Sequence, residues 1–325
     1  MAYSQSVRCE TSMLKYFPFG ETFEPGMGGR VLRGDEPLIE VDDVCYASDV
    51  AQKRSQLEQA PGEYFHAASD TTAAQWEIVE LVLSDLAARR PDCFELAKAG
   101  TRWRFVNRAL DEAHTFDWGD SASLPWAPLD WLGRQVQEDL VLVAADSAGT
   151  FVGGQLCFPN GWDIADRLGH AFLAMHEHTP DSTMPAVQAG GRLLASLRPG
   201  RVFCRIGWNL KLTAQLDLST KYAHLYRGAL AGAAALTPED AGQKIFVRIE
   251  RQTFARLSAS PHLLFGIHTF VSPIEEEARD PERAWRLLQV LKSAPPDVRR
   301  YKIIDAVEHA LFPYLEQRAR EPLAS

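Results

Sequence analysis

The chain has 325 residues, of which 46% are hydrophobic and 24% charged, and its formal net charge at pH 7 is −9. This composition is ordinary for a globular protein, and the negative charge argues against nucleic acid as a partner, because phosphate binding needs clustered lysines and arginines. The five cysteines form no CxxC pair, which indicates reduced thiols rather than a disulfide framework. The sequence has no signal-peptide core and no apolar run of about 18 residues, so we expect a cytoplasmic protein without a membrane segment.

The N-terminal part of the chain is rich in turn-forming residues up to about residue 65. Its GMGGR segment neither follows a strand pattern nor precedes an amphipathic helix, so it does not indicate a phosphate loop. A helix is predicted over 71–90, where Thr72 and Gln75 have capping-box spacing and apolar residues recur at helical intervals. A shorter helix is predicted over 128–140.

Five later segments are predicted to be strands. The first two, 140–146 and 150–158, are separated by a short turn, which is typical of a hairpin. The other three are 201–211, 244–257 and 262–272. The last two of these alternate apolar and polar residues and are joined by SASP, which favours direct antiparallel pairing.

Three helices are predicted in the second half of the chain. A short one spans 162–169 and ends on Gly169. The next is capped by Asp280, with Pro281 at its first position, and the last spans about 297–318. Mostly antiparallel strands, with helices grouped before and after them, predict an α+β fold.

Polar side chains interrupt the predicted strands. Arg205 lies on the strand face opposite to Trp208, and Gln252 lies on the face opposite to Arg251. Such residues most often form a solvated outer face. Alternatively they line a cavity in which arginine binds carboxylates. His268 is either a hydrogen-bonded core residue or a candidate ligand in such a cavity.

The segment AFLAMHEHTP holds the remaining candidates. If it is extended, His176 and His178 share one face and Glu177 points to the other. Such a pair can ligate iron or zinc, and the alternative is one core histidine with a second at the edge of the core. No HExxH, GxSxG, Walker or paired CxxC motif is found in the sequence.

Taken in order, these motifs resemble the α subunit of haem-dependent oxidative N-demethylases, also called dimethylamine monooxygenase. The resemblance rests on the run from DWLGRQVQEDL through CFPNGW to AFLAMHEHTP, on RIGWNL, and on RIERQTFARL followed by LLFGIHTFV. The chain departs from the family pattern at His178, Gly207 and His268. These positions belong to the expected pocket, so the resemblance does not specify dimethylamine as the substrate.

The resemblance implies a PAS-like antiparallel five-stranded sheet that encloses haem b within a single domain spanning 1–325. Residues 1–127 would form a loop-rich and helical extension, 128–272 the sheet core and 273–325 the C-terminal helices. It also implies O₂-dependent oxidation of a small amine or related nitrogen compound, with electrons from a separate subunit that carries flavin and iron–sulfur groups. The alternatives are a haem sensor without turnover and a PAS-like scaffold without a cofactor.

The resemblance also assigns the site residues. It implies that His176 is the axial ligand of the iron, with His178 nearby and His268 as the main competitor. Glu177 would pair with an alkylammonium substrate and transfer protons. Arg205 would anchor a haem propionate or polarise bound O₂. The other expected residues of the haem pocket are Trp208, Arg251 and Gln252.

Overall fold

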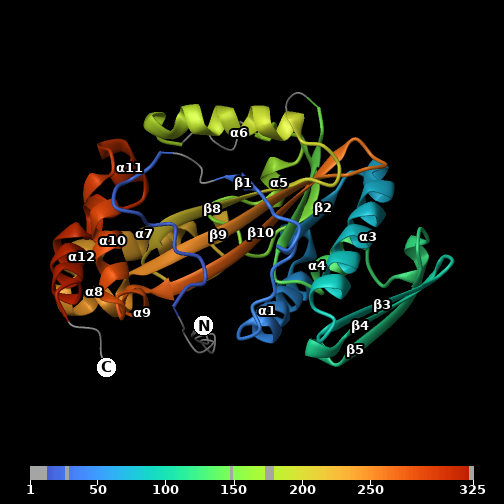
Figure 1. Ribbon diagram of the computed structural model, residues 1–325, viewed down its shortest axis with the longest axis horizontal. Coiled ribbons are helices and arrows are strands. Elements are labelled where there is room, and N and C mark those ends of the chain that lie inside the picture. Colours follow the sequence, from blue (N-terminus) through green and yellow to red (C-terminus); the bar gives the residue numbers. More distant parts are fainter. Residues whose placement is uncertain (1–12, 26–28, 147–148, 173–178, 322–325) are drawn as a thin grey trace.

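An antiparallel sheet of seven strands runs through the centre of the protein (Figure 1). The computed structural model describes residues 13–25, 29–146, 149–172 and 179–321. The spatial order of the strands is β1-β8-β9-β10-β6-β7-β2. Their bounds are β1 Arg30–Val31, β2 Phe65–Ala67, β6 Asp139–Ala144, β7 Phe151–Gln155, β8 Val202–Lys211, β9 Phe246–Arg256 and β10 His262–Pro273.

The five predicted strands are the five central strands of this sheet, β8-β9-β10-β6-β7. The predicted pairings of β6 with β7 and of β9 with β10 are confirmed, and so is the α+β class. The expected number of five strands is wrong, because β1 and β2 extend the two edges. These strands have only 2 and 3 residues, too few for a recognisable alternation.

A second sheet was not predicted. Its three antiparallel strands are β3 (Phe94–Ala99), β4 (Arg102–Asn107) and β5 (Glu112–Asp117). It packs against helix α3 (Thr72–Arg89), where the rings of Trp76 and Phe116 have centroids 5.8 Å apart. The N-terminal extension, predicted to be loop-rich and helical, therefore also contains a sheet.

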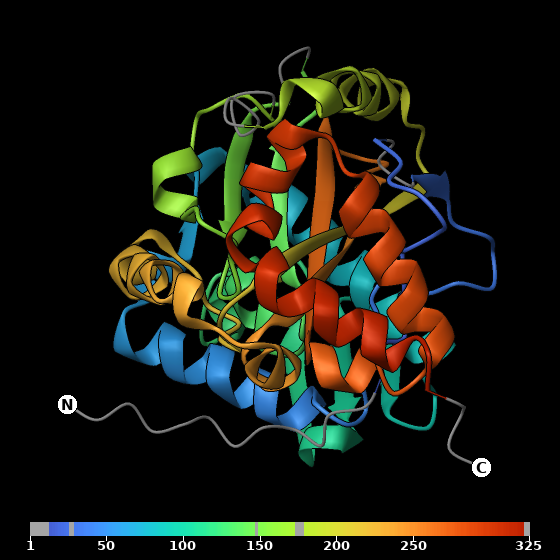
Figure 2. The same ribbon diagram turned by 90° about the vertical axis from the view of Figure 1, so that its left-hand side faces the viewer.

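Helices cover both faces of the large sheet. α1 (Tyr46–Gln59), α3 and α4 (Pro128–Gly133) share a core with one face, whereas α5 (Ile164–Arg167) and α6 (Met184–Ser196) share a core with the other. Figures 1 and 2 accordingly show α6 and α1 on opposite sides of the sheet. A single-turn helix, α2 (Pro61–Tyr64), follows α1. α1 lies in a segment that was expected to contain only turns.

Two predicted helices differ in detail. The helix expected over 128–140 ends at Gly133, and the chain then runs as a buried loop into β6. The N-cap of α3 is Thr71 rather than Thr72. Gln75 donates a hydrogen bond of 3.1 Å to the Thr71 hydroxyl, so the expected capping box is not formed.

The C-terminal helices stack against one end of the sheet (Figure 2). Asp280 caps α10 by accepting a hydrogen bond from the Glu282 amide, as predicted. The last predicted helix is two helices, because Ile303 adopts a left-handed conformation with φ of 57°. The helices in this part of the chain are α7 Ala223–Ala231, α8 Pro238–Lys244, α9 Ile274–Glu277, α10 Pro281–Ser293, α11 Pro296–Tyr301 and α12 Ile304–Arg318.

Two general properties bear on the sequence-based expectations. None of the helices within the described ranges combines the length and the apolar character needed to cross a lipid bilayer. The four described cysteines, Cys45, Cys93, Cys157 and Cys204, are free thiols.

The register defines two chemically different faces of the large sheet. Arg205 of β8 lies opposite Gln252 of β9, and Gly207 lies opposite Glu250, so these side-chain positions share one face. Arg251 lies opposite His268 of β10 on the other face. We call these the Arg205 face and the Arg251 face. The predicted alternation of these strands is confirmed.

Candidate functional site

A chain of hydrogen bonds crosses the middle of the Arg205 face. The Arg248 Nε lies 3.1 Å from Glu250 Oε1, and the Gln252 amide donates a bond of 2.9 Å to Glu250 Oε2. The Gln252 oxygen in turn accepts a bond from Arg205 Nε. Each oxygen of the one carboxylate thus accepts a bond, and the Arg205 guanidinium is held in a fixed orientation by a neutral amide.

The sheet is hollowed above Gly207. A methyl group added at Gly207 would have only one neighbour within 4 Å, the Glu250 carbonyl oxygen at 3.9 Å. Arg205, Gly207 and Glu250 keep partial contact with solvent, and at Arg205 and Gly207 β8 pairs only with β9 within the described structure. Burial nevertheless lowers the pKa of Arg205 to about 10. The side-chain position of Gly207 is therefore open, and we call this space above Gly207, beside Arg205 and Glu250, the recess.

An apolar cavity lies further along the same face. It has a volume of about 380 Å³ and lies between the sheet and α6, with Phe254, Leu263 and Leu194 in its wall. Phe254 is two residues beyond Gln252 on β9, so it shares the face of the recess. Phe172 also lines the cavity and directly precedes the segment that contains His176.

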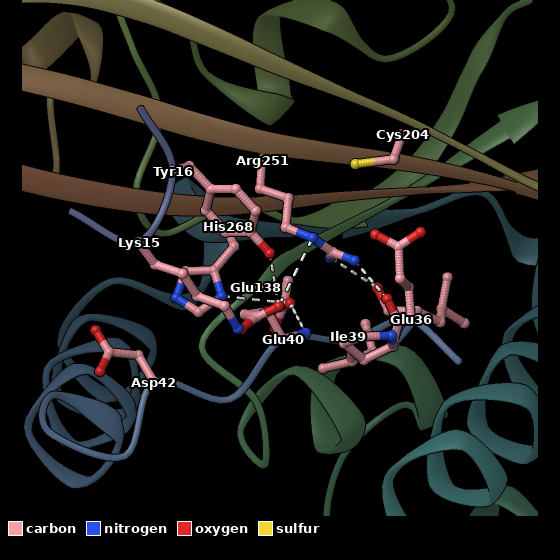
Figure 3. A network of polar contacts seen from close by, with 12 residues as sticks. Lys15, Tyr16, Glu36, Ile39, Glu40, Asp42, Glu138, Cys204, Arg251 and His268 are labelled. Atoms are coloured by element: carbon pink, nitrogen blue, oxygen red, sulfur yellow. Dashed lines mark hydrogen bonds and ion pairs between the residues drawn. The ribbon is translucent and has the colours of Figure 1, made fainter. Parts of the chain in front are cut away.

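Arg251 serves a different purpose on the opposite face. Its guanidinium donates hydrogen bonds to the backbone oxygens of Pro37 and Leu38, the latter at 3.0 Å, and its Nε lies 3.9 Å from Glu40 Oε2. Figure 3 shows this side chain extending from β9 toward the N-terminal segment. Arg251 and Glu40 are only 2% and 4% exposed. The contact therefore fastens residues 36–40 to the sheet.

His268 is enclosed on the same face. Its ring stacks on Phe270 with centroids 4.1 Å apart, and its Nδ1 lies 3.4 Å from Glu138 Oε1. The Glu138 carboxylate also accepts a hydrogen bond of 2.6 Å from the Glu40 amide. Figure 3 shows His268, Glu138 and Glu40 gathered in one network. His268 is 1% exposed, so its ring has almost no contact with solvent.

Trp208 lies at the margin of β8, away from the recess floor. Its ring centroid is 5.0 Å from that of Phe19 and 4.1 Å from the Lys302 ammonium nitrogen. By register it belongs with Ile249 to the Arg251 face. The indole therefore packs with the N-terminal segment and the C-terminal helices.

One comparison with known proteins is decisive for the family. The family model described as "Haem-dependent oxidative N-demethylase, alpha subunit-like" matches residues 33–312. The chain belongs to this family. The match extends from the segment before α1 into α12 and includes both faces of the sheet. The resemblance found in the sequence motifs is thereby confirmed, and the family's name points to haem-dependent oxidative demethylation of nitrogen compounds.

The structure brings only some of the predicted residues of this N-demethylase-like chain together. Arg205 and Gln252 are hydrogen-bonded neighbours at the recess. Arg251, His268 and Trp208 lie on the other face of the sheet. The residues of the predicted ligand segment, His176, Glu177 and His178, are outside the described residues. Within the described ranges, no group of three or more His, Cys, Asp or Glu side chains could hold a metal ion.

Sequence reasoning missed the role of Gly207. In the motif comparison it was only a departure from the family pattern, at a position where the strand loses a side chain. Glycine inside a strand often marks the close approach of another group to the backbone. That signal was available in RIGWNL.

Proposed function

We propose that this chain is the haem-binding, oxidising subunit of an O₂-dependent N-demethylase that acts on a small amine or a related nitrogen compound. The family match over residues 33–312 is the observation that carries the proposal. We further propose a single haem b, bound on the Arg205 face, in a chain that acts as one PAS-like haem-binding domain.

The residues of the Arg205 face fit this group. Haem is an apolar disc with two carboxylates at one edge. The face offers an apolar cavity beside Phe254 and, two residues along the strand, a recess bordered by the Arg205 guanidinium. The vacant side-chain position at Gly207 leaves room at the backbone. The Arg251 face is a poorer fit, because His268 and Arg251 are enclosed by protein partners.

Each side chain then has a distinct part in the proposal. Haem supplies the capacity to bind and reduce O₂ when it is present. His176 is the proposed axial ligand of the iron, and Glu177 pairs with the alkylammonium form of the substrate and moves its proton. Arg205, oriented by Gln252, donates hydrogen bonds to an anionic or polarised group in the recess. Arg251 supports this arrangement from the other face of β9.

Electrons would come from a second subunit. The family description names an alpha subunit, which implies a partner. The sequence has neither a dinucleotide-binding fingerprint nor a cysteine cluster for an iron–sulfur centre. We therefore place the flavin and iron–sulfur groups on a separate reductase.

The test uses purified protein and two histidine variants. We expect wild type to bind haem with a Soret band, and His176→Ala to lose the histidine-type ferrous–CO spectrum. His170→Ala, at an exposed position nearby, is the control and should keep it. With a flavin and iron–sulfur reductase, O₂ consumption that depends on an added secondary amine supports the enzyme. Haem binding without amine-dependent turnover would instead identify a sensor, and the absence of a Soret band would refute both.

A further inference from the structure

The Arg205 face has more cations than carboxylates. Arg248 and Glu250 neutralise each other at 3.1 Å. Arg205, Lys211 and Lys302 remain, and none of them forms an ion pair with a carboxylate of the described chain. Buried cations without a counter-charge are costly, because the protein does not replace the water they lose. Such an excess indicates that an anion is missing from the face.

The two lysines lie on different elements, Lys211 on the Arg205 face and Lys302 at the open edge of β8. Lys211 lies at the end of β8 on the side of Arg205 and Gly207, with its Nζ 4.8 Å from the Tyr226 ring centroid. Lys302 follows α11, and its ammonium donates a hydrogen bond to the Trp208 carbonyl. Both side chains are half-buried. Lys211 therefore belongs to the Arg205 face by register, and Lys302 flanks that face at the edge of β8.

The lowered pKa values of Lys302 and Lys211 support the view that both side chains lie near the same group. Burial lowers the pKa of Lys302 to about 7, helped by the charges of Lys211 and Arg205 and opposed by Glu250. Burial likewise lowers the pKa of Lys211 to about 8, helped by Arg248 and opposed by Glu250. The charge of Glu250, the residue opposite Gly207, thus affects the pKa of both lysines. Near neutral pH they give up protons readily unless an anion is bound between them.

We propose that Lys211, Lys302 and Arg205 bind the two carboxylates of haem, with the apolar part of the ring directed toward the cavity beside Phe254. This inference rests on the proposed function. The arrangement matches the shape of the ligand: cations at one end of the face, a vacant position at Gly207, and an apolar cavity at the other end. Two carboxylates also come close to balancing the three uncompensated cations.

The proposal predicts proton uptake. A bound carboxylate raises the pKa of each lysine, so at pH 8 the protein takes up protons when haem binds. Haem affinity then falls as the pH rises from 7 toward 9, because the lysines must first be protonated. The charged and titratable groups around Lys302 are Arg205, Lys211 and Glu250, and those around Lys211 are Arg248, Glu250 and Tyr226. Glu250 is held by Arg248 and Gln252 through its two oxygens, so the test follows the two lysines.

The experiment titrates haem-free protein with haem and with haem dimethyl ester, which lacks free carboxylates. We expect Lys211→Met and Lys302→Met each to weaken haem binding about 10- to 100-fold, as for a lost hydrogen bond to a charged group, and to bind the ester like wild type. Lys302→Arg should recover most of the affinity. Lys244→Met is the control, because Lys244 is 60% exposed on α8. Calorimetry at pH 8 in two buffers of different ionisation enthalpy should show proton uptake with haem and little with the ester.

The outcomes separate the inference from the proposed function. Equal haem affinity in wild type, Lys211→Met and Lys302→Met, or equal proton uptake with haem and ester, overturns the carboxylate site while leaving haem binding intact. Wild-type protein that binds neither haem nor the ester overturns the proposed function and the inference with it.

Discussion

Arg251 offers a direct test of the difference between the two faces. Its guanidinium donates hydrogen bonds to the carbonyl oxygens of Pro37 and Leu38, and the side chain is 2% exposed. A hydrogen bond that involves a charged group contributes roughly 1.5–3 kcal/mol. Arg251→Met keeps the aliphatic stem and removes both bonds, so we expect the free energy of unfolding to fall by about 3–5 kcal/mol. Haem affinity should change little.

The matched control lies five residues further along the same strand. The Arg256 side chain is half-buried and forms no hydrogen bond or ion pair in the described structure, so Arg256→Met should change the unfolding free energy by no more than about 0.5 kcal/mol. Urea denaturation of the haem-free proteins measures both changes. A loss in Arg251→Met no larger than that of the control would refute the structural role. Loss of haem binding at unchanged stability would place Arg251 in the haem site.

Three further predictions concern buried charge and the recess. Lys53→Met should lower the unfolding free energy by about 3–5 kcal/mol. The reason is that Lys53 Nζ lies 3.6 Å from Asp139 Oδ1 and both side chains are 0% exposed. A change below about 1 kcal/mol in urea denaturation contradicts this prediction. Burial raises the pKa of Asp49 to about 6, above the unfolded value of about 4, so the native state holds this proton more tightly. The stability of wild type relative to Asp49→Asn should therefore fall as the pH rises from 4 to above 6, and parallel stability curves for the two proteins would disprove it. Gly207→Leu should fill the recess and weaken haem binding at least tenfold while Gly207→Ala keeps the fold, and equal Soret titrations of Gly207→Leu and wild type would rule out the recess as the haem site.

The large sheet was predictable because its central strands are long and alternate. β9 and β10 have 11 and 12 residues and pair along their whole lengths. Helix α1 was not predictable by the same means. Its buried positions, Tyr46, Val50, Lys53 and Leu57, have helical spacing, but one of them is a lysine that is buried through an ion pair. A charged residue within the buried stripe conceals the helix from any pattern based on hydrophobicity.

For the candidate site, the sequence predicted the strand faces of individual residues but not the neighbours that those faces contact. Alternation placed Arg205 opposite Trp208 on one strand and Gln252 opposite Arg251 on the other, and the register confirms both and adds that Arg205 and Gln252 share a face. What alternation does not give is the neighbour that each face meets. Carbonyl oxygens of the N-terminal segment accept hydrogen bonds from Arg251. This contact joins residues more than 200 positions apart in the sequence. Lys302 reaches the Trp208 carbonyl because α11 ends beside β8, which no local pattern reveals.

The short length of β1 has a consequence for self-association. β1 pairs only with Phe203 and Cys204, so the rest of β8 has no further strand beside it within the described structure. Free backbone groups along such an edge are a template for a strand from another molecule. The Lys302 side chain occupies the Trp208 carbonyl on this edge, so a strand added from another molecule would have to displace it before it could bond there.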